Sequence, residues 1–91
     1  MKSRKNKNYY VVIRGRNVGV FDNWPECEEQ VLYYHKAFYK KVESLDQAMG
    51  LICEHMWSDG PYFIHIGKYN KRFSHYDMFL DCLERLSKEN C

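Results

Sequence analysis

The sequence lacks the features that mark secreted, membrane-spanning and metal-binding proteins. Its four cysteines form no C-x-x-C pair, and no apolar stretch near the N-terminus has the form of a secretion signal. No apolar run is long enough to span a bilayer, and 91 residues give little room for a sizeable catalytic cleft. We therefore expect a small protein with reduced thiols, in the cytoplasm or the nucleus, that has no contact with a membrane.

A strong excess of positive charge is also lacking, because 14 Lys and Arg residues stand against 12 Asp and Glu residues. A net charge of +2 does not identify a nucleic-acid-binding protein by itself, so the local placement of the cations decides. They gather in residues 1–8, around Gly15, and at Lys36, Lys40 and Lys41. Aromatic residues make up 16% of the chain, which is high for a protein of this size, and they fill a core, a binding face, or both.

Turn residues and apolar spacing predict an α+β domain with a three-stranded antiparallel sheet and two helices, in the order β-β-α-β-α. Asn23 and Ser44 are each followed three residues later by Glu or Gln, which is the capping-box pattern of a helix start. The expected elements are strands at residues 9–13 and 18–21, a helix after Asn23, a strand at residues 38–42 and a helix after Ser44.

A break at Ser58-Asp59-Gly60-Pro61 predicts a boundary between residues 9–57 and an extension at residues 58–91. Residues 1–8 are expected to form a disordered basic arm. In the extension we expect a strand at residues 62–66 and a helix that Ser74 opens, which together pack on the sheet or help to form a homodimer. The apolar face of this helix should consist of Met78, Phe79, Cys82, Leu83 and Leu86.

The extension can be aligned with the front of the chain, which suggests a partial repeat. The alignment places Tyr62 on Tyr10 and Tyr76 on Trp24. Chance similarity between two strand-turn-helix segments explains this alignment at least as well.

The segment from Tyr9 to Val42 combines aromatic rings with fixed cations in an order that resembles a known family. The matching residues are Tyr10-Val11-Val12, Arg14-Gly15-Arg16, Gly19-Val20-Phe21, Trp24 with Glu26-Cys27, Gln30-Val31, and Ala37 leading to Tyr39-Lys40-Lys41. With the helix that follows, this segment resembles the N-terminal hybrid-binding domain of eukaryotic-type ribonuclease H, which also occurs in caulimovirus viroplasmin.

The resemblance implies sequence-independent, non-catalytic binding of RNA/DNA hybrid or double-stranded RNA through the minor groove and the phosphate backbone. It implies a pocket for the DNA strand formed by Tyr10, Trp24 and Tyr39, and phosphate contacts from Lys40 and Lys41. Backbone amides near the loop before the third strand would meet RNA 2′-hydroxyls. A ribonuclease H catalytic domain, linked or separate, is an implied partner, and no cofactor or metal is expected.

Elementary chemistry agrees with this division of roles. An A-like duplex has a wide, shallow minor groove lined by 2′-hydroxyls, which flat rings and main-chain amides can reach. We add Arg16 and Lys36 as peripheral phosphate contacts. The chain departs from the family in the loop at residues 32–36, where Leu-Tyr-Tyr-His-Lys replaces a segment that usually contains Gly or Pro, so the approach of the backbone to RNA is restricted there.

Other interpretations of these residues stay open at this point. A Trp at a helix start is often part of the core, and adjacent lysines on a strand often protect a sheet edge or point to opposite faces. The histidines and cysteines lack the spacing of a zinc finger, and Cys27 with His35 lacks an orienting third group for nucleophilic catalysis. The competing functional class is a protein-interaction or self-association module of the viroplasmin type.

Overall fold

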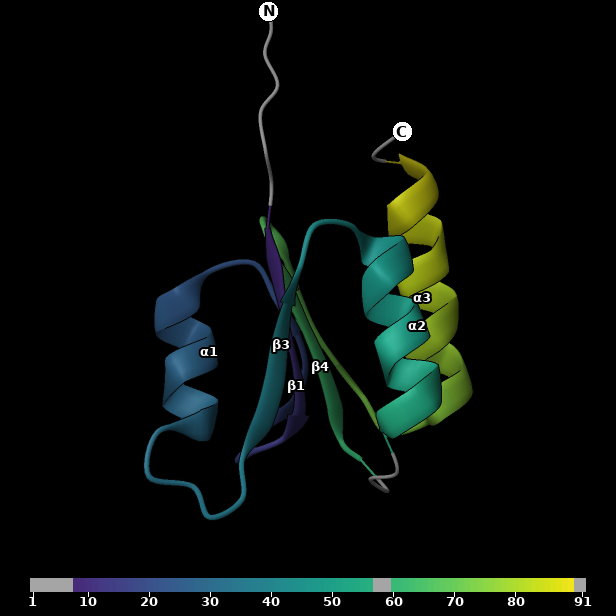
Figure 1. Cartoon of the computed structure of the whole chain (residues 1–91). Coiled ribbons are helices and arrows are strands. Elements are labelled where there is room, and N and C mark those ends of the chain that lie inside the picture. The colour runs from purple at the N-terminus through teal and green to yellow at the C-terminus, as the bar shows by residue number, and fades with distance from the viewer. Residues whose placement is uncertain (1–7, 57–59, 90–91) are drawn as a thin grey trace, which may run out of the picture.

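The computed structural model describes residues 8–56 and 60–89 (Figure 1). The arm expected at residues 1–8 lies, apart from Asn8, outside the described residues. The elements in chain order are β1 (Tyr9–Arg14), β2 (Val18–Phe21), α1 (Trp24–Val31), β3 (Phe38–Val42), α2 (Leu45–His55), β4 (Tyr62–Ile66), β5 (Tyr69–Phe73) and α3 (Tyr76–Glu89).

The five strands form one mixed sheet in the order β3-β1-β2-β4-β5. Strand β4 runs parallel to β2, whereas the other neighbouring pairs are antiparallel. The α+β class is therefore confirmed, and the three helices are the two predicted for the front of the chain and the one predicted for the extension. The prediction of a three-stranded antiparallel sheet undercounts the strands and lacks the parallel pair. It missed β5 because Asn70, Lys71 and Arg72 interrupt the alternation of apolar and polar residues that marks a strand.

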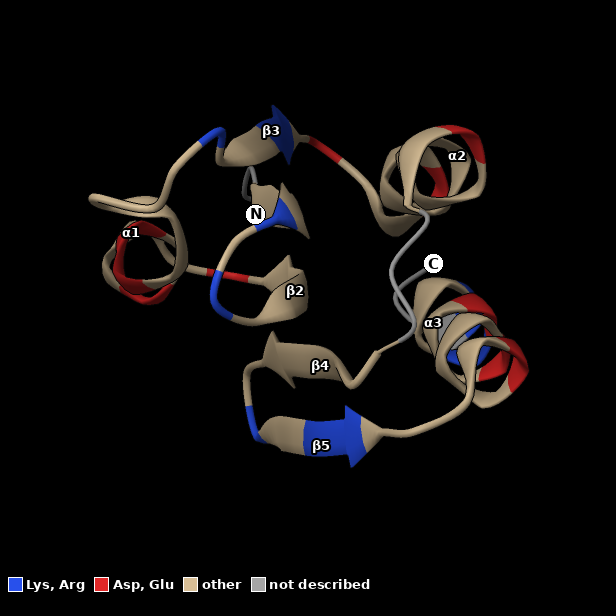
Figure 2. Ribbon diagram, turned by 90° about the horizontal axis from the view of Figure 1, so that it is seen from below, with Lys and Arg blue, Asp and Glu red and all other residues tan. Residues whose placement is uncertain are grey.

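The sheet is covered on both faces, by α1 on one side and by α2 and α3 on the other (Figure 2). Alternate residues of the strands point to opposite faces. Val11, Val20 and Ile64 belong to the larger core with α2 and α3. A smaller core on the α1 side contains Val12, Phe21 and Cys27. Residues next to one another in a strand therefore pack into different cores, one on each face of the sheet.

The helix starts agree with their predicted caps. The Asn23 side chain accepts a hydrogen bond from the Glu26 amide at 3.0 Å, and the Ser44 hydroxyl accepts one from the Gln47 amide at 3.2 Å. Helix α3 buries Phe79, Cys82 and Leu83 and partly buries Leu86, as expected. Met78 is 61% exposed, so its assignment to the apolar face was wrong. None of the helices in the described ranges is long and apolar enough to cross a membrane.

Residues 60–89 are built into the same sheet as the front of the chain. Asp22, at the end of β2, accepts a hydrogen bond from the Gly67 amide at 2.7 Å and donates its own amide to the His65 carbonyl at 3.0 Å. These bonds tie the β4–β5 turn to the start of α1. The placement of the domain boundary at residue 58 remains a prediction.

The two hairpin-helix units share an aromatic pair at the positions that the sequence aligns. Tyr10 and Trp24 have ring centroids 5.8 Å apart, and Tyr62 and Tyr76 have centroids 5.7 Å apart. Since β4 runs parallel to β2, the second hairpin is turned over relative to the first, and its helix lies on the opposite face of the sheet. The partial repeat itself remains a prediction.

Candidate nucleic-acid interface

Three aromatic rings from three different elements meet at the surface beside the start of α1. Trp24 is the first residue of α1, directly after the Asn23 cap, while Tyr10 lies in β1 and Tyr39 in β3. The Trp24 ring centroid lies 5.8 Å from that of Tyr10 and 5.5 Å from that of Tyr39, at interplanar angles of 53° and 48°. We call these three residues the aromatic trio.

The aromatic trio is a surface feature and not part of a sealed core. Trp24 is 39% exposed and Tyr39 is 38% exposed, whereas Tyr10 is half-buried against Val12 and its neighbours. Part of each ring therefore packs against the protein, and the rest is exposed to solvent. Such a supported ring can receive the flat apolar side of a ligand without having to be ordered first.

The two lysines of β3 leave the sheet on opposite faces. Lys41 is the cross-strand partner of Tyr10, and Lys40 is the partner of Val11. Because cross-strand partners share a face, Lys41 lies on the face of the aromatic trio, whereas Lys40 points to the face that α2 covers. Both lysines are exposed. The structure thus brings Lys41 and the trio together and separates Lys40 from them.

The loop between α1 and β3 has a defined backbone. The Tyr34 amide donates to the Val31 carbonyl at 3.1 Å, and the Ala37 amide donates to the Tyr34 carbonyl at 3.2 Å. Tyr33 and Lys36 have φ angles of 60° and 59°, in the left-handed region that favours glycine. The chain therefore keeps glycine-like geometry where the resemblance leads one to expect Gly or Pro, and it adds exposed side chains there.

Arg16 holds the end of α1. Its Nη1 donates to the carbonyls of Glu29 at 2.9 Å and Leu32 at 2.7 Å, which would otherwise lack partners at the helix C-terminus. Its amide donates to the Gln30 carbonyl at 2.8 Å. Gly15 permits this approach, since a Cβ there would lie 2.6 Å from the Gln30 oxygen. Sequence reasoning missed this capping role, because two arginines around a turn glycine do not reveal which distant carbonyls they reach.

A second arginine of the β1–β2 hairpin, Arg14, also contacts the loop between α1 and β3. Arg14 Nη1 lies 3.4 Å from the Lys36 carbonyl oxygen. Lys36 itself is exposed, and its side chain extends from the end of the loop that leads into β3. The loop is thus held near both its ends by cations of the β1–β2 hairpin, and Lys36 is the cation that it offers to solvent.

Further cations lie at the other edge of the sheet. Lys71 and Arg72 are exposed on β5, and the Lys71 ammonium lies 5.9 Å from the centre of the Tyr69 ring. Four strand spacings, or about 19 Å, separate β5 from β3. Figure 2 shows cations on both edge strands, whereas acidic residues gather on the helices. The β5 cations are therefore a separate group from the aromatic trio.

The described ranges contain no candidate metal centre, and Cys27 has the properties of a core residue. Residues 8–56 and 60–89 contain no group of three or more His, Cys, Asp or Glu side chains that could hold a metal ion. Cys27 is fully buried, and this burial raises the pKa of its thiol to about 11. A thiol with such a pKa stays protonated near neutral pH, so Cys27 is a core residue and not an activated nucleophile.

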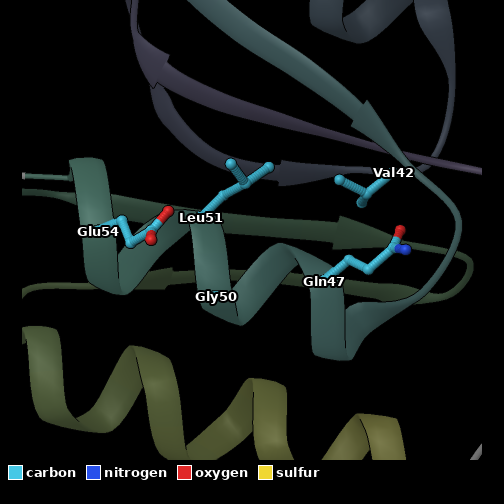
Figure 3. A pocket seen from close by; sticks show the side chains of 5 residues that line it. All are labelled: Val42, Gln47, Gly50, Leu51 and Glu54. Atoms are coloured by element: carbon cyan, nitrogen blue, oxygen red, sulfur yellow. The ribbon is translucent and has the colours of Figure 1, made fainter.

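A shallow pocket lies between α2 and the end of β3 (Figure 3). Its lining residues are Val42, Gln47, Gly50, Leu51 and Glu54. Val42 belongs to the core on the α2 side of the sheet, so this pocket faces away from the aromatic trio. Its lining brings together one carboxylate and one amide and presents no nucleophile or cation.

Comparison with known proteins assigns the front of the chain to a family. Residues 8–50 match the family model described as "Ribonuclease H1 N-terminal domain". The match covers 43 of the 91 residues and confirms the resemblance found in the sequence. The matched segment contains the aromatic trio, Lys40, Lys41 and the loop between α1 and β3, whereas β4, β5 and α3 lie outside it.

Curated relatives are ribonucleases H of much greater length. The protein from Saccharomyces cerevisiae is 42% identical over 45 residues, which cover 50% of this chain and 13% of the relative. The protein from Schizosaccharomyces pombe is 38% identical over 58 residues, covering 59% and 22%. Ribonuclease H1 from Mus musculus is 38% identical over 52 residues, covering 57% and 18%. The chain thus spans less than a quarter of the length of these relatives.

Proposed function

We propose that this protein binds duplexes that contain RNA, namely RNA/DNA hybrids and double-stranded RNA, without catalysing a reaction. In this proposal it grips the minor groove and the phosphate backbone, and it reads no base sequence. The observation that carries the proposal is the aromatic trio at the surface with Lys41 beside it, within a segment that matches the ribonuclease H1 N-terminal domain family.

The aromatic trio suits the deoxyribose side of a hybrid. A ring pressed against a sugar leaves no room for a 2′-hydroxyl, so Trp24 and Tyr39 favour a DNA strand at this position. The backbone of the loop between α1 and β3 suits the RNA strand, because main-chain donors and acceptors gain a partner in each 2′-hydroxyl. Helix α1 separates these two surfaces by about 12 Å, given its eight residues. The protein can therefore contact the DNA strand and the RNA strand at the same time across one groove.

The phosphate contacts come from cations at the border of these surfaces. Lys41 lies beside the trio, Lys36 lies at the end of the loop, and Lys40 can reach around the exposed edge of β3 with its long side chain. Arg16 serves mainly to hold the loop, since its guanidinium already bonds two carbonyls. With about three phosphates neutralised, the log-log salt slope should be near −3 and the dissociation constant micromolar or weaker at physiological salt.

The role in a larger activity follows from the relatives. A binding module of this kind would hold a hybrid near a ribonuclease H catalytic domain, in the same chain or in a separate protein. Such an arrangement raises the effective concentration of the substrate at the catalytic domain. The module itself supplies affinity and no bond cleavage.

The proposal can be tested by titrating labelled hybrid, duplex RNA, duplex DNA and single strands at two salt concentrations. The hybrid and duplex RNA should bind more tightly than duplex DNA, and Trp24→Ala should weaken hybrid binding about fivefold or more. Met78→Ala, which removes an exposed apolar side chain on α3, is the matched control and should change nothing. Equal and weak binding of all ligands would instead favour a protein-interaction module.

A further inference from the structure

Tyr33 is displayed in an unusual way. It is 92% exposed, whereas Trp24 and Tyr39 are 39% and 38% exposed, so its ring has almost no contact with the rest of the protein. Its φ of 60° places a bulky residue in the left-handed region, which is costly for residues other than glycine. Conformations of this kind persist where the surrounding structure enforces them, and they concentrate at ligand-binding positions.

The surrounding bonds enforce this conformation. The residue before Tyr33 is held through its carbonyl, which accepts from Arg16 Nη1 at 2.7 Å, and through its amide, which donates to Glu28 at 2.8 Å. The residue after it, Tyr34, donates its amide to the Val31 carbonyl. The ring of Tyr33 is therefore presented from a fixed backbone and not from a free loop.

We propose that Tyr33 is a stacking platform for an unpaired nucleobase that extends from the duplex, an inference that rests on the proposed function. Unlike the rings of the aromatic trio, its ring is not backed by neighbouring residues, so both of its faces are accessible. Bases inside a duplex are already stacked on one another, whereas a base of a single-stranded extension has a free face that can stack on the ring of Tyr33. Stacking of this type tolerates any base, because every base has a flat π-face.

The neighbours of Tyr33 present both apolar surface and charge, since Leu32 and Tyr34 are 46% and 39% exposed. Lys36 and His35 are both exposed and follow it within the same loop, where the ammonium of Lys36 can hold the phosphate of an extended strand. The loop lies about one length of α1 away from Trp24. An unpaired extension on the loop side of the duplex can therefore reach Tyr33.

The test compares a short blunt hybrid with hybrids that carry a few unpaired nucleotides on either end of either strand. At least one extension should tighten binding about five- to tenfold. Tyr33→Gly should abolish this gain, measured as the ratio of the affinities for the extended and the blunt hybrid, because glycine accepts a φ of 60° and removes only the ring. Tyr33→Phe, the matched control, should keep the gain, since it keeps the stacking surface.

The outcomes separate this inference from the proposed function. If the blunt hybrid binds but no extension tightens it, or if Tyr33→Gly keeps the full gain, the stacking platform is refuted and hybrid binding stands. If Tyr33→Gly weakens the blunt hybrid as strongly as the extended one, Tyr33 contacts the duplex itself and the inference is equally overturned. If neither blunt nor extended hybrids bind, both proposals fail.

Discussion

The separation of the two β3 lysines onto opposite faces of the sheet leads to a quantitative prediction. Lys41→Gln should weaken binding of an RNA/DNA hybrid more than Lys40→Gln does. Lys41 is the cross-strand partner of Tyr10 and shares the face of the aromatic trio, whereas Lys40 is paired with the buried Val11. The two variants remove the same charge from adjacent exposed positions, so each is a control for the other.

The size of the effect follows from counterion release. Loss of one phosphate contact should reduce the log-log salt slope by about 0.9. Between about 50 and 200 mM salt, wild-type affinity should therefore fall about 3.5-fold more than that of Lys41→Gln. Lys40→Gln should change the slope by less than half of this amount, and the double variant should have the flattest slope of all.

Fluorescence anisotropy of a labelled hybrid at several salt concentrations measures these slopes directly. Folding of each variant should be checked by thermal unfolding, which should be unchanged because both side chains are exposed. An unaltered slope for Lys41→Gln would remove this residue from the interface. A larger effect for Lys40→Gln would mean that the duplex lies on the edge or the α2 side of β3, and the proposed placement of the ligand would be wrong.

Three further predictions concern the stability of the fold. Arg16→Ala removes the hydrogen bonds to the carbonyls at the end of α1, so it should lower the free energy of unfolding by about 1–2 kcal/mol. It should also weaken hybrid binding without changing the salt slope. A salt slope smaller by about 0.9 would show that Arg16 contacts a phosphate instead. Gly50→Ala should raise the free energy of unfolding by about 1 kcal/mol in urea titrations, since an added Cβ meets nothing within 4 Å, and a decrease would contradict this account. Burial raises the pKa of the Cys27 thiol from 9.0 to about 11, so the unfolded state loses a proton first and stability should fall as the pH rises from 9.0 to about 11. Cys27→Ala should flatten this fall in pH-dependent unfolding, although its cavity lowers stability at every pH, and an equally steep fall would assign the effect to other groups.

The local elements of the front half could be predicted from the sequence because their signals are local. Asn23 and Ser44 each bond the amide three residues on, as the capping pattern requires. The hairpin at residues 9–21 carries its turn chemistry within its own sequence. In such cases the residues that determine the structure are neighbours in the chain, and the pattern is sufficient.

The sheet order could not be predicted, because it depends on a contact between distant segments. Strand β4 pairs in parallel with β2 across more than forty residues, and Asp22 joins the two through the Gly67 amide. No local pattern marks either partner of that contact. The same holds for Arg16, whose carbonyl partners lie at the C-terminal end of α1 and directly after it. It also holds for β5, because the polar residues at its centre hide the strand pattern.

The composition of the site was predictable only where the family resemblance supplied it. Tyr10, Trp24 and Tyr39 come together as the resemblance implied, although they are distant in the chain and belong to three elements. Strand alternation already indicated that Lys40 and Lys41 would separate, but the face that each takes depends on the register between β1 and β3. The exposed and left-handed Tyr33 had no signal in the sequence beyond the missing glycine.

The preference among duplexes of identical sequence tests the central claim most directly. Dissociation constants for the RNA/DNA hybrid, duplex RNA and duplex DNA should be measured by competition at one salt concentration. The account predicts that both RNA-containing duplexes compete better than duplex DNA and that Trp24→Ala removes most of the hybrid's advantage. Equal competition by all three duplexes, with or without Trp24, would contradict it.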